Sequence, residues 1–301
     1  MPRLTAIVPA TNRPPTLDRC VAAIEGADEA PEQLVVVDEC AHPGPAAARN
    51  EGARRADGDV LVFVDADVVV HADAFRRIRH AFADEGLAGL FGSYDDSPAE
   101  PDAVSGFRNL LHHHVHQSGA GPAETFWAGL GALRRDAFIR AGGFDEARYA
   151  VPSIEDVELG LRLARDGARI VLDPDVQGTH LKRWTLGEMV RTDLFQRGIP
   201  WVELLLRGGG GSAALNLGWR HRLSALAAVG VAGGVVGRRP LVAASSLGAL
   251  LALNQDFYAL LLRKRGPAQA AAGVGLHVVH HLTSVAAVPA GIAAHLLERR
   301  W

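Results

Sequence analysis

Two acidic residues near the N-terminus have the type and spacing that suit a divalent metal ion. Asp65 and Asp67 are separated by one residue and directly follow Val60–Val64, an apolar segment with polar residues on both sides. Such a short segment predicts a strand that is buried on both faces. Open α/β sheets bind ligands at the carboxyl ends of their strands. Two hard oxygen ligands there suit Mg²⁺ or Mn²⁺, with phosphates of a substrate completing the shell; the alternative is two solvated acids at a strand end.

The residues around this acid pair predict the elements that position it. Residues 5–9 and 34–37 predict two further strands, and residues 17–26 and 45–56 predict the helices that connect the three strands. Right-handed crossovers turn this β-α-β-α-β order into a parallel sheet. Asp38, which follows the second strand, is therefore expected at the same edge as the acid pair. No G-x-G-x-x-G loop follows the first strand, which argues against a dinucleotide enzyme.

Several short motifs along residues 4–205 together resemble the family 2 glycosyltransferases. Their order and spacing carry the resemblance. The motifs are Ile7-Val8-Pro9 with Asn12-Arg13-Pro14, Val36-Val37-Asp38, Ala48-Arg49-Asn50-Glu51-Gly52, Phe63-Val64-Asp65-Ala66-Asp67, Phe126-Trp127-Ala128-Gly129, Gly142-Gly143-Phe144-Asp145-Glu146 and Ile154-Glu155-Asp156-Val157-Glu158-Leu159-Gly160. The resemblance implies an α/β chain with the GT-A fold of nucleotide-diphospho-sugar transferases, a mostly parallel sheet flanked by helices.

The resemblance also implies roles for individual residues. Asp65 and Asp67 would hold a divalent metal, Mg²⁺ or Mn²⁺, on the donor diphosphate. An acid of the Glu155-Asp156 pair would act as the general base, with Asp156 as the first candidate. The donor nucleotide would be bound by Pro9, Thr11, Arg13, Asp38, Arg49 and Asp65.

These residue types match the chemistry of sugar transfer. Positive charge develops at the anomeric carbon and negative charge on the leaving phosphate, and a metal anchored by Asp67 would neutralise the leaving group. A carboxylate on the opposite face would deprotonate the acceptor hydroxyl as it attacks. One base with one displacement inverts the anomeric centre, by the geometric logic that separates the two classes of glycosidase.

Asp156 also has a structural interpretation. Ser153 and Asp156 have the spacing of a capping box, and the apolar residues that follow them share one face of a helix. The positive end of that helix would keep a carboxylate ionised, as a general base requires in its resting state. Both interpretations are open at this point, and Glu155 is the second candidate for the base.

Three other features have both a functional and a structural interpretation. His180 follows a strand predicted at residues 169–172, where related GT-A enzymes sometimes place a residue near the diphosphate or metal; it is either a metal ligand or a plain loop histidine. Trp127 offers a flat apolar surface for the acceptor, or it is a core residue. The histidines at positions 112–116 point in different directions on a helix, so we expect a structural or acceptor-contacting role there rather than metal binding.

The composition excludes several classes of function. The 301 residues carry a formal net charge of -3, which offers no case for nucleic-acid binding. Two cysteines, Cys20 and Cys40, provide no disulfide framework and suit a reducing compartment. The chain enters a predicted core strand almost at once, so no signal peptide is expected.

The last third of the chain is apolar and rich in small residues. After glycines at 208–211 come apolar segments at 223–236, 241–253 and 268–297. A helix that spans a membrane needs about 20 apolar residues, which only the third segment reaches, although His277, His280 and His281 interrupt it. The small residues and the scarcity of charge favour membrane association over a soluble helical domain. Basic residues flank every apolar segment, so the charges do not settle the topology.

We therefore expect residues 1–206 to form a GT-A catalytic domain and residues 207–301 a membrane-associated helical region. The chain would be an inverting glycosyltransferase at the cell membrane, with its catalytic domain on the cytoplasmic side, that uses a nucleotide-sugar donor and a lipid or saccharide acceptor. A nucleotidyltransferase is the second possibility, but residues 11–15 are not the Gly-rich basic loop that it would need. The third is a catalytically degenerate, membrane-anchored subunit that binds nucleotide sugars; against it stands the presence of Asp38, Asp65, Asp67 and Asp156.

Overall fold

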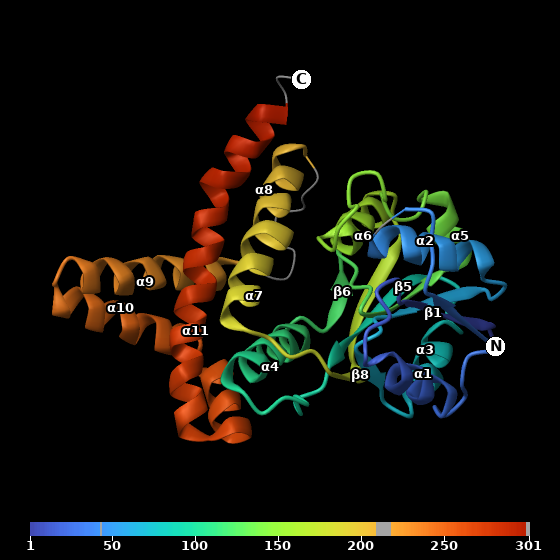
Figure 1. Cartoon of the computed structure of the whole chain (residues 1–301), viewed down its shortest axis with the longest axis horizontal. Coiled ribbons are helices and arrows are strands. Elements are labelled where there is room, and N and C mark those ends of the chain that lie inside the picture. The colour runs from blue at the N-terminus through green and yellow to red at the C-terminus, as the bar shows by residue number, and fades with distance from the viewer. Residues whose placement is uncertain (43, 209–217, 299–301) are drawn as a thin grey trace. The chain divides into compact units, whose positions relative to one another are not determined.

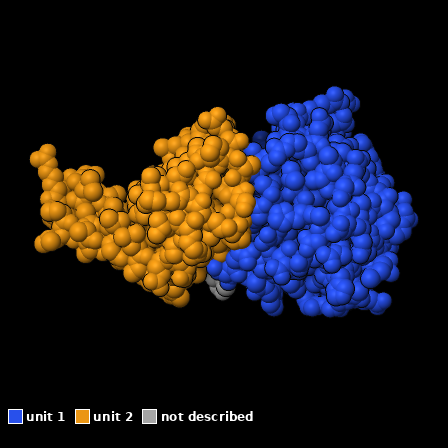
Figure 2. Space-filling model, turned by 90° about the horizontal axis from the view of Figure 1, so that it is seen from below, with its two compact units in different colours: residues 1–95, 116–182 blue, residues 96–115, 183–301 orange. Residues whose placement is uncertain are grey.

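A computed structural model describes residues 1–42, 44–208 and 218–298 (Figure 1). Its contacts divide the chain into two compact units, which Figure 2 shows in different colours. Residues 1–95 and 116–182 form unit 1, and residues 96–115 and 183–301 form unit 2. The boundary that we expected at residue 206 stays a prediction, because these units describe contacts rather than pieces that fold alone. Three of the four glycines expected to separate the domains, at 209–211, lie outside the described residues.

Unit 1 is built on one mixed sheet. Its strand order is β2-β1-β3-β7-β5-β8-β4, and β6 pairs with β8 outside this path. The strands are β1 Leu4–Pro9, β2 Gln33–Val37, β3 Val60–Val64, β4 Val68–Val70, β5 Leu87–Tyr94, β6 Gly121–Ala123, β7 Leu130–Arg134 and β8 Arg169–His180.

The first three strands confirm the predicted β-α-β-α-β unit. Strand β1 lies between β2 and β3 and is parallel to both, with Pro9 opposite Val37 and Ile7 opposite Phe63. The predicted connecting helices are α1, Leu17–Glu25, and α2, Pro45–Arg55. The carboxyl ends of these three strands therefore lie at one edge of the sheet, as expected.

The rest of the sheet is not mostly parallel. Strand β7 runs antiparallel to both β3 and β5, and β8 is parallel to β5 but antiparallel to β4 and β6. The predicted α/β class with flanking helices is confirmed, but the expectation of a mostly parallel sheet was wrong: the sheet is mixed, because β7 and β4 run antiparallel to their neighbours. Helices α2, α5 (Arg135–Arg140) and α6 (Glu155–Arg165) cover one face, and α1 and α3 (Ala74–Ala81) cover the other (Figure 1).

Alternation along the strands separates two parts of the core, because successive side chains of a strand point to opposite faces. Phe63 of β3 packs against Phe126, Phe138 and Phe144, with ring centroids 5.3–6.3 Å apart. On the opposite face, Val62 of β3 belongs to one cluster of buried side chains with Cys20 and Ile24 of α1 and Phe75 and Ile78 of α3.

Unit 2 is helical. The predicted apolar segments are helices α9, Trp219–Val236, and α10, Pro240–Leu253, followed by α11, Gln255–Glu298. Helix α11 begins earlier than predicted and kinks at Gly266, whose φ is 78°. Its residues 255–297 are long and apolar enough to cross a membrane, judged by length and composition. The remaining helices are α4 Ala103–Ser118, the unit boundary falling within it, α7 Leu186–Arg191, the π-helical segment η1 Thr192–Gly198 and α8 Ile199–Leu206.

A buried ionic network lies within this helical unit. Arg108 donates from Nη1 to Asp193 Oδ1 at 2.8 Å, and the other oxygen of Asp193 lies 2.7 Å from Nδ1 of His280. The Asp193 side chain is 3% exposed. The two partners therefore compensate a carboxylate that would be costly to bury alone.

Candidate active site

The ends of β1 and β2 bring together two of the residues expected to bind the donor nucleotide. Pro9 ends β1, and the N–H of the next residue donates to the Val37 carbonyl at 2.8 Å. In the loops beyond, Arg13 Nη2 lies 2.5 Å from Asp38 Oδ2. The hydrogen bond from Arg13 lowers the pKa of Asp38 below its ordinary value. Thr11 is exposed in the same loop as Arg13.

The acid pair after β3 leads directly into the short strand β4. Val68 of β4 lies opposite His180, the last residue of β8, in an antiparallel pair. The Asp67 carbonyl accepts a hydrogen bond from the N–H of Leu181 at 2.8 Å. The prediction that β8 ends near residue 172 was therefore wrong: β8 continues to His180 because its last residues pair with β4. This pairing is what brings His180 to Asp67.

Asp67 and His180 fit a shared cation. Asp67 Oδ2 lies 3.4 Å from His180 Nε2, and the two side chains are 28% and 7% exposed. Two ligands bound at about 2.1 Å and at right angles to each other are about 3 Å apart. Burial alone would raise the pKa of Asp67, but hydrogen bonding and charge from His180 hold it below the ordinary value. No three such side chains among the described residues can hold an ion alone, so oxygens of a substrate must complete the shell.

Arg49 of α2 joins the acid pair to the start of α6. Its Nη2 lies 2.7 Å from Asp65 Oδ1, and its Nη1 lies 2.9 Å from Glu155 Oε1. The side chains of Arg49 and Glu155 are about one-twentieth exposed, at 6% and 5%. The guanidinium also lies over the Phe144 ring, 5.6 Å from its centroid. The charge of Asp65 and then of Glu155 raises the pKa of Arg49, although burial opposes this.

Asp156, next to Glu155, is half-buried in the first turn of α6. Its Oδ2 accepts a hydrogen bond from the N–H of Ala128 at 3.0 Å, and its Oδ1 accepts one from Val157 at 2.8 Å. Burial raises the pKa of Asp156 to about 6, and the charge of Glu155 adds to the rise. A carboxylate with this pKa is ionised at neutral pH and accepts a proton more readily than an ordinary aspartate.

The capping-box interpretation of Asp156 was wrong. Helix α6 begins at Glu155, and its N-cap residue is Ile154 rather than Ser153. Glu155, not Asp156, bonds the backbone that precedes the helix: its Oε2 accepts a hydrogen bond from the N–H of Ser153 at 2.9 Å. Asp156 instead accepts hydrogen bonds from the N–H groups of Val157 and Ala128, which hold its carboxylate in place.

Trp127 directly precedes Ala128, whose N–H binds Asp156, and its side chain is half-buried. Its ring makes edge-to-face contacts with Tyr94 and His116, at centroid distances of 4.9 and 5.3 Å. Gly129 permits its position, because a Cβ there would lie 2.4 Å from the indole. Tyr94 in turn stacks on His180 at 4.1 Å with an angle of 8°. A continuous set of rings therefore links the expected acceptor residue to the expected metal ligand.

Sequence reasoning missed several of these supporting contacts. Tyr94 was not a candidate, because nothing in its sequence surroundings signals a ring stack that depends on the pairing of β5 with β8. Asn50 was also missed as a positioning residue: its amide exchanges two hydrogen bonds, each 2.9 Å, with the backbone of Phe144. Its place beside Arg49 in the quoted motif was the available signal.

Comparisons with known proteins agree with this geometry. The family model described as Glycosyl transferase family 2 matches residues 39–141, which include the acid pair and Trp127. The curated pre-mycofactocin glycosyltransferases of two Mycobacterium tuberculosis strains are 26% identical over 225 residues, covering 65% of this chain and 46% of theirs. The chain thus spans about half the length of the curated relatives that it matches.

Among solved structures, the chain is similar to the mannosyltransferase PcManGT from Pyrobaculum calidifontis, solved in complex with GDP-Man and Mn²⁺. The TM-score is 0.56 at 19% identity, over 99% of this chain and 88% of the other. At this identity the likeness concerns the fold, and it confirms the predicted GT-A-like architecture.

Proposed function

We propose that this chain, whose residues 39–141 match the glycosyltransferase family 2 model and whose fold is GT-A-like, transfers a sugar from a nucleotide-diphosphate donor to a hydroxyl group. The observation that carries this proposal is the buried bridge through Arg49. It ties the acids at the end of β3 to the start of α6, where Asp156 lies. Arg49 thereby holds the expected leaving-group site, at Asp65 and Asp67, and the candidate base, Asp156, in one site.

Donor binding falls to the loops after β1, β2 and β3. Asp38 and Arg13 lie at the ends of adjacent strands, where open sheets bind nucleotides. In this proposal Asp38 accepts hydrogen bonds from the base or ribose, and Pro9 and Thr11 line the same loop. Arg49 contributes by fixing Asp65 and adding positive charge near the diphosphate.

The donor set of Asp67 and His180 supports a divalent cation at the diphosphate, with Asp65 as a further oxygen donor. Mg²⁺ or Mn²⁺, when bound there, would neutralise charge on the departing diphosphate. The protein's own contribution is placement: the pairing of β4 with β8 sets the distance between Asp67 and His180. The Tyr94 stack holds the His180 ring plane.

Asp156 acts as the general base in this proposal, with Glu155 as a positioning residue. The N–H of Ala128 holds the Asp156 carboxylate beside Trp127. The acceptor hydroxyl gives its proton to Asp156 as its oxygen attacks the anomeric carbon, and the bond to the diphosphate breaks on the opposite side. A single displacement of this kind inverts the anomeric centre.

The proposed acceptor is a lipid or lipid-linked saccharide. The support is the apolar C-terminal part of the chain, where large apolar side chains of α9, α10 and α11 are exposed. Trp127 would contact the acceptor, since a flat ring suits the apolar face of a sugar or a lipid. The proposed location is the cell membrane, with the catalytic unit on its cytoplasmic side.

A screen of nucleotide sugars tests this function. Full-length protein in detergent is incubated with each donor and either Mn²⁺ or Mg²⁺, and release of nucleoside diphosphate is followed. The proposal expects turnover of one donor class that chelator abolishes and that lipid extract accelerates. Turnover that persists in excess chelator would refute the metal-assisted mechanism.

A further inference from the structure

Helices α9 and α10 form a hairpin that carries no charged residue between the arginines at its base and those at its turn. Residues 223–237 and 240–255 contain no Asp, Glu, Lys or Arg. Large apolar side chains are nevertheless exposed on it: Leu226 is 68% exposed, Val236 83% and Leu241 84%. On α10 the only buried hydrophobic side chain is Leu250. A soluble domain rarely leaves such a surface in water.

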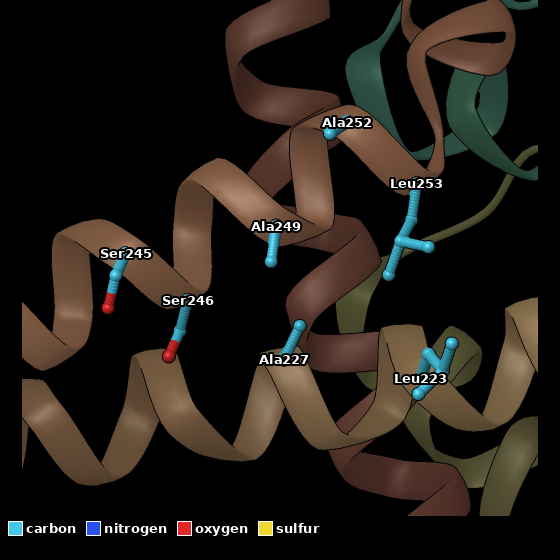
Figure 3. Close-up of a pocket in the computed structure, with 7 residues that line it drawn as sticks. All are labelled: Leu223, Ala227, Ser245, Ser246, Ala249, Ala252 and Leu253. Atoms are coloured by element: carbon cyan, nitrogen blue, oxygen red, sulfur yellow. The ribbon is translucent and has the colours of Figure 1, made fainter.

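The two helices pack as membrane helices do. Gly230 and Gly234 are four residues apart on α9 and face α10. A Cβ at Gly230 would lie 2.3 Å from the Ser246 hydroxyl, and one at Gly234 would lie 2.5 Å from the Ala243 nitrogen. Such spacing of small residues is typical of helix pairs in lipid, where close backbone contact replaces the hydrophobic effect. Away from the turn, small side chains such as Ala227 and Ala249 leave an open groove of about 590 Å³ (Figure 3).

Polar side chains inside the hairpin are bonded within it. Ser224 is fully buried and accepts from the Asn254 amide at 2.9 Å. The same amide donates to the Leu250 carbonyl at 2.9 Å, and the Ser245 hydroxyl donates to the Val242 carbonyl at 3.2 Å. Internal partners of this kind are what a bilayer demands, because lipid chains offer none.

Arginines mark both ends of the hairpin. Arg220 and Arg222 lie at its base and Arg238 and Arg239 at its turn. Arg222 and Arg238 are 16 positions apart, which corresponds to about 24 Å at the rise of a helix, against about 30 Å for the hydrocarbon core. Arginine side chains make up such a difference by extending towards headgroups, and anionic headgroups complement their charge.

Helix α11, although longer, has surroundings that suit lipid less well. It buries His277 and His281, and His280 pairs with Asp193. The helices η1 and α8 pack along it, and together with α7 they carry Glu188, Arg191, Asp193, Arg197 and Glu203. Within the helical unit, α9 and α10 cross α11 instead of running along it (Figure 1), so the hairpin and α11 cannot both follow the bilayer normal.

We propose that the α9–α10 hairpin, and not α11, enters the bilayer, turn first, while α11 lies at the membrane surface. The hairpin exposes large apolar side chains, Ser224, Ser245 and Asn254 are bonded within it, and its charges stand only at the two levels where headgroups lie. This inference rests on the membrane association in the proposed function but not on sugar transfer.

Flotation of full-length protein with vesicles of phosphatidylethanolamine and phosphatidylglycerol tests the inference. Leu226→Asp on α9 is compared with Val288→Asp on α11, both at exposed apolar positions, 68% and 47%. Leu226 lies four residues, about 6 Å, inside the level of Arg222, so a charge there should lower the partition coefficient of Leu226→Asp about tenfold or more. Val288→Asp should float like wild type. Helix content and melting in detergent check that both variants fold.

Three outcomes would overturn the inference. Loss of flotation in Val288→Asp, alone or equally with Leu226→Asp, would assign insertion to α11. A wild-type chain that stays in water and dimerises through α9 would assign the hairpin to a second copy. A fluorophore on a cysteine at position 226 gives a reading without a charged variant. Lipids that carry nitroxides on their acyl chains should quench it, and failure to be quenched would also overturn the inference. No readout depends on turnover, so an inactive chain that floats through its hairpin still supports it.

Discussion

A single buried guanidinium joins acids from elements that are far apart in sequence. Arg49 reaches Asp65 at 2.7 Å and Glu155 at 2.9 Å, and both contacts use the planar fork that only arginine has. Because Glu155 is almost fully buried, its charge depends on this partner. Arg49 therefore positions both ends of the proposed site as well as stabilising the fold.

Arg49→Met should destabilise the protein strongly. Removing one partner of a buried ion pair costs about 3–5 kcal/mol, since the remaining carboxylate stays buried without compensation. Arg140→Met is the matched control, because Arg140 and Asp136 pair on the surface with 70% and 63% exposure, where such a pair contributes less than about 1 kcal/mol. Denaturant unfolding of both variants measures the difference, and equal effects would contradict the role given to Arg49.

Asp67→Asn should abolish metal-dependent donor binding without unfolding the protein. The substitution keeps the volume of the side chain but removes the charge beside His180. Calorimetric titration of nucleoside diphosphate with and without Mn²⁺ measures the effect, and the melting temperature serves as the control. Metal-dependent binding of wild-type strength in a folded variant would show that Asp67 is not a ligand.

The rate of transfer should fall as the pH drops below about 6. Burial raises the pKa of Asp156 to about 6, and only the ionised carboxylate can accept a proton, so activity is present above that pH and lost below it. Asp156→Asn should lower kcat by about 10²–10⁴-fold, the usual contribution of a general base, and should remove this limb of the profile. An unchanged acid limb in Asp156→Asn would assign it to another group.

At the scale of elements, α6 must approach the segment before β7 closely. A Cβ at Gly160 would lie 2.1 Å from the nitrogen of Phe126, so only glycine permits this contact. The approach brings the N-terminus of α6 to Ala128, whose N–H holds Asp156. The position of the proposed base therefore depends on a glycine one helical turn away.

Gly160→Ala should displace α6 and lower transfer while the sheet stays folded. The control is Gly187→Ala in α7, where an added Cβ meets nothing within 4 Å. Alanine is favoured over glycine in a helix interior by about 1 kcal/mol, so the control should be neutral or slightly stabilising. Steady-state kinetics and thermal melting distinguish the two, and wild-type activity in Gly160→Ala would contradict the proposed contact.

Local patterns predicted the parallel part of this fold but not the pairings that complete the site. Strands β1, β2 and β3 are short apolar segments separated by helices, and the handedness of crossovers then fixes their order. The antiparallel course of β7 and the pairing of β4 with β8 depend on register between distant segments, which apolar patterns do not encode. His180 was therefore a candidate without a partner, and the ion pairs of Arg49 with Asp65 and Glu155 were not predicted.

At the scale of the whole molecule, the chain combines an α/β unit that holds every nominated donor residue with a helical unit that holds the apolar hairpin. The division is not a single cut in the sequence, because residues 96–115 belong to the helical unit. Chemistry and membrane association are therefore assigned to separate parts of the structure. Variants in the α/β unit can therefore test the chemistry without altering the helical unit, and variants in the helical unit can test membrane association without altering the α/β unit.

The measurement that tests the central claim most directly is donor turnover by wild type, Asp67→Asn and Asp156→Asn, followed as nucleoside diphosphate released from a panel of nucleotide sugars. The account predicts that wild type turns over one donor class with Mn²⁺ or Mg²⁺ and stops in chelator. Asp67→Asn should lose donor binding and turnover, and Asp156→Asn should bind the donor but lose most transfer. Binding of a nucleotide sugar by wild type without any turnover, with metal and lipid present, would contradict the account and identify the chain as a binding subunit.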